Sequence, residues 1–375
     1  MIPYGHQLIE REDIEAVIGV LTSDWLTTGP YIEKFESSLC EYTGAHHAIA
    51  VNSATSALDI AVQALELPPG SEVISTAFTF AATNNALLYN DLKPVFADIL
   101  QDTRNINPQD IRRKITPSTR AIMVVDYAGH PCDLNEIREI ADEHDLYLIE
   151  DAAHALGSTY NGKKIGTFSD ITIFSFHPVK PITTGEGGAA LTNNSDLANK
   201  MYLLRSHGVV KSGNHTIDTG KSWQYDMTHL GRNYRLTDIQ AALGLSQMKK
   251  LDLFIRKRNE LAVQYQKELS DVPFIELPET RKGILHGWHI YTLLVRDIDR
   301  NRFFAYMRDK GIGVNVHYIP TYRFSYYLNR LPQKFTNFPV TEEVFKRILT
   351  LPLHPGMSNS DMCKVIDSVI TYNQK

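Results

Sequence analysis

Short apolar segments alternate with helical patterns between residues 48 and 149. The strand patterns lie at 48–51, 72–75, 94–97, 121–125 and 146–149, and the helical patterns lie at 57–65, 80–89, 108–114 and 134–144. Strands that alternate with helices form largely parallel sheets with helices on both faces. The carboxyl ends of such strands meet at one edge, where these folds bind ligands. The alternation therefore predicts an α/β domain with its site at that edge.

The pattern changes after residue 151. An Asn161-Gly162 pair between short extended pieces predicts a hairpin. Further strands are predicted at 171–176, 188–191, 288–295 and 313–318, with helices at 7–21, around Phe35 and Leu39, at 195–205 and as one long helix from 238 to about 255. A chain of 375 residues exceeds one ordinary core. We therefore expect a large domain over residues 1–250 and a smaller α/β domain over 251–375.

Composition narrows the class of partner. The net charge of −5 and the isoelectric point near 6.3 give no basic surface for nucleic acid or anionic lipid. No apolar run has the length of a membrane span, and the N-terminus lacks a signal-peptide pattern. The three cysteines are odd in number and widely spaced, which suits a reducing compartment. A cytoplasmic protein without nucleic-acid or membrane partners is expected.

Lys180 follows the strand pattern at 171–176 and stands between Pro178 and Pro181. The two prolines fix the backbone and exclude a helix through this lysine. At the end of a buried strand the ammonium loses hydration, and desolvation lowers its pKa. A neutral amine so placed is what Schiff-base chemistry with a carbonyl compound requires. The alternative is an ordinary lysine in a surface loop.

Two other predicted strand ends carry groups that suit a flat, phosphorylated ligand. Residues 52–56, Asn-Ser-Ala-Thr-Ser, offer hydroxyls and backbone N–H groups at a helix N-terminus, where a phosphate binds well. The alternative is an ordinary helix cap. This loop is neither GxGxxG nor a P-loop, which argues against a dinucleotide or nucleoside-triphosphate enzyme. Phe80 begins a helix and could stack on a ring, although core packing is the commoner role of an aromatic residue.

Asp151 directly follows an apolar strand, and a buried carboxylate needs a cation or hydrogen-bond donors. A protonated pyridine nitrogen could be that cation, and a helix cap or salt bridge is the alternative. His154, Ser175 and His177 could face the same ligand, and His207 is a weaker candidate. A phosphate site, a ring stack, a carboxylate and a lysine together match pyridoxal 5′-phosphate (PLP), an electron sink once bound to lysine.

The sequence resembles, almost end to end, the DegT/DnrJ/EryC1/StrS family of sugar-nucleotide aminotransferases, which are fold-type I, aspartate-aminotransferase-like PLP enzymes. The matching motifs lie at 25–30, 52–57, 77–83, 150–157, 174–188 and 233–240. The resemblance implies that Lys180 binds the cofactor covalently and then carries the proton. It also implies that Asp151 pairs with the ring nitrogen and that Phe80 stacks on the ring.

By the same resemblance, Ala54, Thr55 and Ser175 hold the phosphate together with Asn233 of a neighbouring subunit. The family pattern thus implies a homodimer with shared active sites. His154 occupies a position where many members carry glutamine, and a hydrogen bond near the ring hydroxyl is expected.

Within the family, the motifs at 125–129, 154–158, 180–184, 205–208 and 316–320 are similar to those of the aminotransferases of pseudaminic-acid biosynthesis. That similarity implies UDP-2-acetamido-2,6-dideoxy-β-L-arabino-hex-4-ulose as amine acceptor and L-glutamate as donor. It also implies sugar-nucleotide contacts at Tyr4, Arg235, His317 and Tyr318, whose alternative role is domain packing.

Other readings stay open. The acceptor could be another UDP-, dTDP- or GDP-linked keto sugar. A non-catalytic PLP-binding regulator is a further alternative, against which Lys180, Asp151 and Ser175 argue. Dehydratase relatives that carry histidine in place of the lysine are disfavoured by Lys180.

Overall fold

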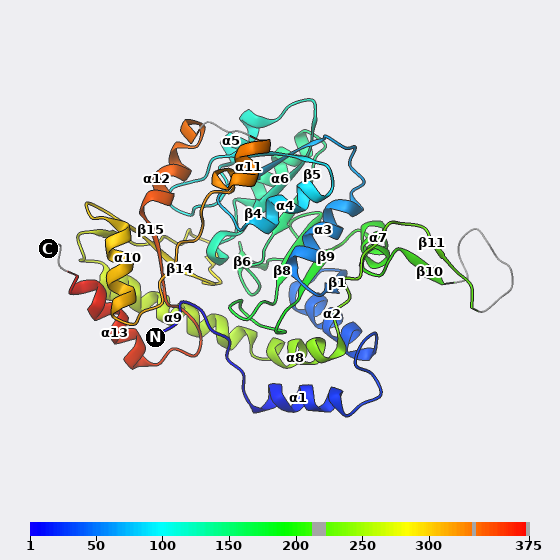
Figure 1. Cartoon of the computed structure of the whole chain (residues 1–375), viewed down its shortest axis with the longest axis horizontal. Helices are drawn as coiled ribbons and strands as arrows, with labels where there is room; N and C mark the ends of the chain where they lie inside the picture. Colours follow the sequence, from blue (N-terminus) through cyan, green and yellow to red (C-terminus); the bar gives the residue numbers. More distant parts are fainter. Residues whose placement is uncertain (212–222, 332–334, 373–375) are drawn as a thin grey trace.

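The chain folds around a seven-stranded sheet (Figure 1). The computed structural model describes residues 1–211, 223–331 and 335–372. In spatial order, the strands are β1 (His47–Val51), β9 (Gly188–Thr192), β8 (Ile171–Ser175), β5 (Tyr147–Asp151), β4 (Thr119–Val125), β2 (Glu72–Thr76) and β3 (Lys93–Ala97). Only β9 runs against its neighbours, since it pairs antiparallel with both β1 and β8. The prediction of a mostly parallel sheet is confirmed.

Helices cover both faces of this sheet, because neighbouring strand residues point to opposite sides and both sets are apolar. In β4, Ile122 and Val124 belong to one buried cluster, while Ala121 and Met123 belong to another. The first face carries α2 (Pro30–Thr43), α5 (Pro108–Lys114), α6 (Leu134–Glu143) and α8 (Asp238–Met248). The second face carries α3 (Ala54–Ala64), α4 (Ala81–Tyr89) and α7 (Ser195–Arg205).

The C-terminal part has its own core. It is built on the small sheet β12 (Ile275–Glu276), β14 (Tyr291–Val295) and β15 (Ile348–Leu351) with α9 (Leu251–Leu269), α10 (Arg300–Asp309) and α13 (Asn359–Ile370). Helix α12 (Pro339–Arg347) packs instead through Val344 in a cluster with Phe78 and Tyr127. Ile2 packs in this core and exchanges backbone hydrogen bonds with Gly311 and Gly313. The N-terminus thus lies beside the C-terminal part, as Figure 1 shows. The division at residue 250 stays a prediction.

The remaining elements lie at the periphery. They are α1 (Arg11–Leu21), α11 (Ser325–Arg330), the strands β6 (Thr159–Tyr160), β7 (Lys163–Lys164) and β13 (Ile284–Leu285), and the hairpin β10 (Val209–Lys211) with β11 (Tyr225–Met227). The Asn161-Gly162 turn between β6 and β7 is confirmed, with positive φ at both residues. The β10–β11 hairpin projects from the body next to α7 (Figure 1). Within the described part of the chain, no helix combines the length and hydrophobicity needed to cross a membrane.

Four expected elements differ from the structure. The long helix after residue 238 is two helices, because the break at Lys249 and Lys250 lets the Lys250 ammonium reach Asp13 at 2.5 Å. The strand expected at 288–295 begins at Tyr291, because the carbonyls of Trp288 and His289 accept hydrogen bonds from Arg258 instead. The segment 313–318 forms only an isolated bridge from Asn315 to Thr350, and the first helix starts at Arg11 rather than residue 7.

Candidate active site

A cavity of about 560 Å³ opens at the carboxyl edge of the large sheet, where β5 and β8 end. Segments far apart in sequence close it, from Tyr4 at the N-terminus to residues 315–318. The predicted site residues that line it are Tyr4, Ala54, Thr55, Phe80, Asp151, His154, Ser175, Lys180, His317 and Tyr318. His177 lines the cavity as well, so the structure brings together all the predicted site residues except Asn233, Arg235 and the weaker candidate His207.

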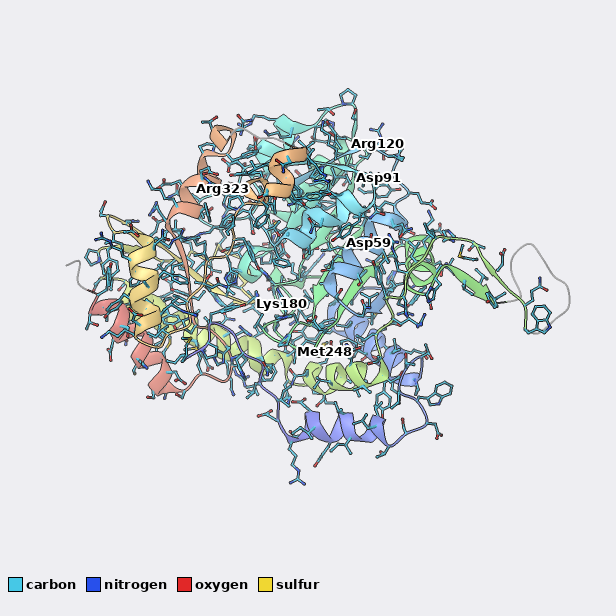
Figure 2. The ribbon with its side chains drawn as sticks, viewed as in Figure 1. Asp59, Asp91, Arg120, Lys180, Met248 and Arg323 are labelled. Atoms are coloured by element: carbon cyan, nitrogen blue, oxygen red, sulfur yellow. The ribbon has the colours of Figure 1, made fainter. Side chains whose placement is uncertain are left out.

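Lys180 lies in the turn after β8, near the middle of the molecule (Figure 2). Its backbone N–H donates to the carbonyl of His177 at 2.9 Å, which closes the turn. Desolvation lowers the pKa of Lys180 to about 8, although the nearby Asp151 carboxylate opposes this shift. About a tenth of the amine is then free at pH 7, and the free amine is the form that attacks an aldehyde.

Asp151 is the last residue of β5 and is almost fully buried. Its Oδ2 accepts a hydrogen bond from the Thr83 hydroxyl at 2.7 Å, and its Oδ1 accepts one from the Ala153 N–H at 3.2 Å. Burial raises the pKa of this carboxyl, against the effect of the two donors. A cationic ring nitrogen beside it would favour the ionised form again.

The N-terminus of α3 forms the second end of the cavity. Ser53 caps this helix by accepting a hydrogen bond from the Ser56 N–H at 3.0 Å. The first N–H groups of a helix, here those of Ala54 and Thr55, have no acceptor in their own helix. Gly188 lies so close that a Cβ there would be 2.5 Å from the Ala54 nitrogen. The glycine thus lets strand β9 approach a helix end suited to an anion.

Phe80 precedes α4 and is 63% exposed, although it lines the cavity. Its ring centre lies 6.2 Å from that of Tyr318. An exposed aromatic face beside Lys180 and Asp151 can stack on a planar ring. The helix end, the carboxylate, the aromatic face and the lysine together fit the phosphate, ring nitrogen, ring face and aldehyde of PLP.

His289 was not predicted from the sequence, yet its Nε2 lies 3.4 Å from the Lys180 amine. Its ring stands 4.2 Å from that of His154. Burial and the nearby Lys180 hold the pKa of both histidines well below its usual value, so both are neutral. Arg258, also missed, is fully buried and donates to three carbonyls of the C-terminal part and, at 3.5 Å, to the carbonyl of Lys180.

His317 lines the cavity, but both of its ring nitrogens have partners in the protein. The Asn315 amide oxygen accepts from the Val316 N–H at 2.8 Å, so the amide nitrogen faces His317 Nε2 and donates to it at 3.2 Å. The Nδ1–H then donates to the Thr350 hydroxyl at 2.8 Å. The His317 ring is therefore placed to contact a ligand by its face rather than by a hydrogen bond.

Asn233 and Arg235 do not line the cavity of their own chain. Asn233 is exposed and pairs with Ser206 through a backbone bridge, and Arg235 donates to the Ser206 hydroxyl at 2.9 Å. His207 also lies outside the residues that line the cavity. The predicted role of Asn233 in a second subunit stays a prediction.

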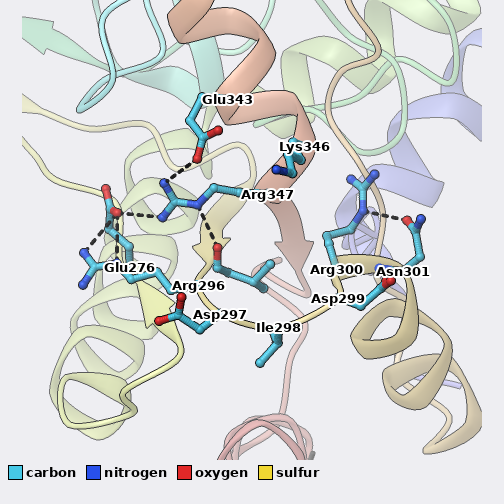
Figure 3. Close-up of a pocket in the computed structure, with 11 residues that line it drawn as sticks. Glu276, Arg296, Asp297, Ile298, Asp299, Arg300, Asn301, Glu343, Lys346 and Arg347 are labelled. Atoms are coloured by element: carbon cyan, nitrogen blue, oxygen red, sulfur yellow. Dashed lines mark hydrogen bonds and ion pairs between the residues drawn. The ribbon is translucent and has the colours of Figure 1, made fainter.

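A second hollow, of about 770 Å³, lies in the C-terminal part (Figure 3). Four of its charged side chains pair with one another, since Glu276 accepts from both Arg296 and Arg347 at 3.0 Å and Arg347 also contacts Glu343. In the part of the chain that the structure describes, no group of three or more histidine, cysteine or carboxylate side chains is placed to hold a metal ion.

Comparisons with known proteins agree with this site. The family model of the DegT/DnrJ/EryC1/StrS aminotransferase family matches residues 7–370. The UDP-4-amino-4,6-dideoxy-N-acetyl-β-L-altrosamine transaminase of Campylobacter jejuni is 40% identical over 381 residues, covering 100% of this chain and 98% of the relative.

Solved structures agree as well. Helicobacter pylori PseC, an aminotransferase involved in the biosynthesis of pseudoaminic acid, superposes with a TM-score of 0.93 at 34% identity, covering 98% of both chains. A Streptococcus pneumoniae structure in its PLP form gives a TM-score of 0.92 at 30% identity, covering 99% of this chain and 98% of the other.

Proposed function

This chain belongs to the DegT/DnrJ/EryC1/StrS aminotransferase family, and we propose that it converts UDP-2-acetamido-2,6-dideoxy-β-L-arabino-hex-4-ulose to UDP-4-amino-4,6-dideoxy-N-acetyl-β-L-altrosamine with L-glutamate as amine donor. As a member of the family it is a PLP-dependent sugar-nucleotide aminotransferase. The observation that carries the choice of sugar is the 40% identity, over the whole chain, to the Campylobacter transaminase.

The cavity supports this assignment. Burial keeps His154 and His289 neutral, and the hydroxyls of Tyr4 and Tyr318 keep their protons because burial raises their pKa values. Neutral donors and acceptors suit the uncharged hydroxyl and keto groups of a sugar.

We assign the roles of the chain's own residues as follows. PLP, when bound, supplies an electron sink for the charge that develops at the carbon losing its proton. Asp151 holds the ring nitrogen protonated. Lys180 Nζ takes the proton from Cα of the amino donor, and a pKa of about 8 suits such a base at neutral pH. The same amine returns a proton when the keto sugar accepts the nitrogen.

The proposal includes a homodimer in which Asn233 and Arg235 complete the site of the partner. Both residues lie outside the cavity of their own chain, and Phe80 at the cavity is 63% exposed in a single chain. Trp25 and Leu26, in one of the family motifs, are about half exposed as well. A second copy would cover these apolar side chains.

The substrate is tested with purified holoenzyme, L-glutamate and a panel of UDP-, dTDP- and GDP-linked 4-keto and 3-keto sugars, with products identified by mass spectrometry and NMR. We expect the UDP-linked 2-acetamido-4-keto sugar to react with the highest kcat/KM. A higher kcat/KM with another keto sugar would replace the proposed substrate. Lys180→Ala should fold but not turn over, while Lys163→Ala, which changes an exposed lysine, should retain activity.

Shared sites are tested by mixing two inactive variants, Lys180→Ala and Asn233→Ala, after reversible dissociation. If the site is shared, mixed dimers contain one intact site, and about one quarter of wild-type activity returns because half of the dimers are mixed. If both residues serve the same chain, no activity returns.

A further inference from the structure

The backbone at Ala128 fixes the hydrogen-bonding state of His154. Ala128 lies in the tight turn Tyr127–Gly129 after β4 and has a φ of +60°, a conformation rare for a residue with a side chain. Its N–H points at His154 Nδ1, 3.2 Å away, and its carbonyl accepts from the His289 N–H at 2.8 Å. A backbone N–H can only donate. The Nδ1 atom of His154 must therefore be the nitrogen without hydrogen.

The other ring nitrogen then carries the hydrogen. His154 is 5% exposed, and burial next to Lys180 keeps its pKa well below 6.5, so the ring is neutral and holds one proton, on Nε2. The Tyr318 hydroxyl oxygen lies 3.1 Å from this Nε2. The Nε2–H therefore donates to Tyr318, whose oxygen acts as acceptor.

A hydroxyl that accepts from His154 still has its own hydrogen to donate. Burial keeps the pKa of Tyr318 above its usual value, so the hydrogen stays in place. The centre of the Tyr318 ring lies 6.4 Å from that of the Tyr127 ring. The Tyr127 hydroxyl donates to the carbonyl of His317 at 2.5 Å, so the Tyr127 hydrogen is already used. Tyr318 lines the cavity. Its free hydrogen is therefore available to a ligand there.

We propose that the chain from the Ala128 N–H through His154 makes Tyr318 a fixed hydrogen-bond donor to an oxygen of the ligand, with His154 as the positioning residue that sets the direction. The proposal rests on the proposed function in that the ligand oxygen belongs either to the keto group of the sugar or to the ring hydroxyl of the cofactor. In both cases the acceptor is an oxygen that carries or gains negative charge. A neutral, preoriented donor stabilises that charge without reorganisation.

The test compares the holoenzyme with Tyr318→Phe, His154→Met and His154→Gln. Glutamine can accept from the Ala128 N–H with its oxygen and donate to Tyr318 with its nitrogen, as histidine does. Methionine has similar length but is only a weak acceptor and cannot donate to Tyr318. We expect Tyr318→Phe and His154→Met to slow the affected half-reaction by about 100-fold, the usual cost of losing one such donor. His154→Gln should restore most of the rate.

Two readouts identify the acceptor. If it is the keto oxygen of the sugar, only the half-reaction with the keto sugar slows, and the pH titration of the cofactor absorbance stays as in the wild type. If it is the ring oxygen of the cofactor, the midpoint of that titration shifts without any substrate. Wild-type rates and titrations in Tyr318→Phe would overturn the proposal, as would a His154→Gln variant as slow as His154→Met. Circular dichroism and thermal unfolding verify that each variant is folded.

A further measurement does not depend on turnover. NMR of protein labelled with ¹⁵N-histidine should show His154 as the neutral Nε2–H tautomer, and an Nδ1–H tautomer would overturn the inference. A wild-type enzyme that aminates no keto sugar of the panel would refute the proposed function, and the tautomer and the absorbance titration would still test the role of His154 and Tyr318.

Discussion

Replacing Asp126 by asparagine should stabilise the protein at neutral pH. Asp126 and Glu150 are both fully buried below the cavity, and Asp126 Oδ1 accepts from the Cys132 N–H at 2.9 Å. Glu150 Oε2 accepts from the hydroxyls of Ser169 at 2.7 Å and Thr172 at 3.0 Å. The remaining oxygens, Asp126 Oδ2 and Glu150 Oε1, have no donor among the described residues. A hydrogen bond between the two carboxyls therefore needs a proton on one of them.

Burial, together with the charge of Glu150, holds the pKa of Asp126 well above its usual value. The folded protein then binds a proton that the unfolded chain releases above a pH of about 3.9. Because the folded-state pKa is raised, the stabilisation is complete below the unfolded pKa and is lost as the pH rises. Each pH unit in this window lowers the free energy of unfolding by about 1.4 kcal/mol.

Asparagine removes this proton uptake. Its Nδ2–H donates to Glu150 and its oxygen accepts from Cys132, so both hydrogen bonds are kept. We expect Asp126→Asn to match the wild type near pH 4 and to exceed it increasingly as the pH rises, by up to about 1.4 kcal/mol per pH unit while Asp126 stays protonated in the folded wild type. Between pH 5 and 7 the free energy of unfolding of the wild type should fall more steeply with pH than that of the variant.

The measurement is urea unfolding of both proteins at pH 5, 6 and 7 with saturating PLP, so that the pH dependence of cofactor binding enters both curves equally. Asp24→Asn, which changes an exposed carboxylate, serves as the control and should follow the wild type. A variant with the same pH slope as the wild type would refute the reasoning, because the proton would then not be on Asp126.

Three other changes have expected outcomes. Desolvation lowers the pKa of Lys180 to about 8. The rate of PLP binding to the apo-protein should therefore rise about tenfold per pH unit below pH 8 and level off above it, as followed by stopped-flow absorbance. A rise that continues to pH 10 would contradict the lowered pKa. Gly188→Ala puts a Cβ 2.5 Å from the Ala54 nitrogen. The Kd of PLP from fluorescence titration should therefore increase at least about tenfold, the equivalent of one weakened hydrogen bond. Gly19→Ala, with open space around it, should leave the Kd unchanged. Arg258→Met leaves buried carbonyls without their donor, so the free energy of unfolding should fall by about 3 kcal/mol. Arg256→Met, at an exposed site, should have little effect. Equal unfolding curves for the two variants would show that the carbonyls do not need Arg258.

Local patterns predicted the elements whose ends are set by neighbouring residues. The helices 108–114 and 195–205 agree with α5 and α7 to the residue, because Pro108 begins the first and Asn194 caps the second with its own side chain. Lys180 and Asp151 were found because the end of a buried parallel strand marks the ligand edge of such a sheet.

Contacts between distant segments could not be predicted in this way. His289 stands 109 residues from Lys180, and Lys250 stands 237 residues from the Asp13 that it binds. Neither sequence position has a local pattern that differs from an ordinary core histidine or a helical lysine. The break between α8 and α9 and the strand start at Tyr291 follow from such distant contacts. The helix and the strand predicted from local patterns alone were therefore too long.

The pairing of Ile2 with Gly311 and Gly313 has a consequence for the order in which the molecule is assembled. Tyr4, which lines the cavity, is held from the other side by the Leu353 N–H, which donates to its carbonyl at 3.0 Å. Ile2 and Tyr4 therefore wait for partners more than 300 residues later in the chain, and at usual rates of synthesis about 15 to 70 s separate them. The large sheet can form on the ribosome while the cavity still lacks a wall. Cofactor binding is thereby delayed until the segment that contains Leu353 has been made.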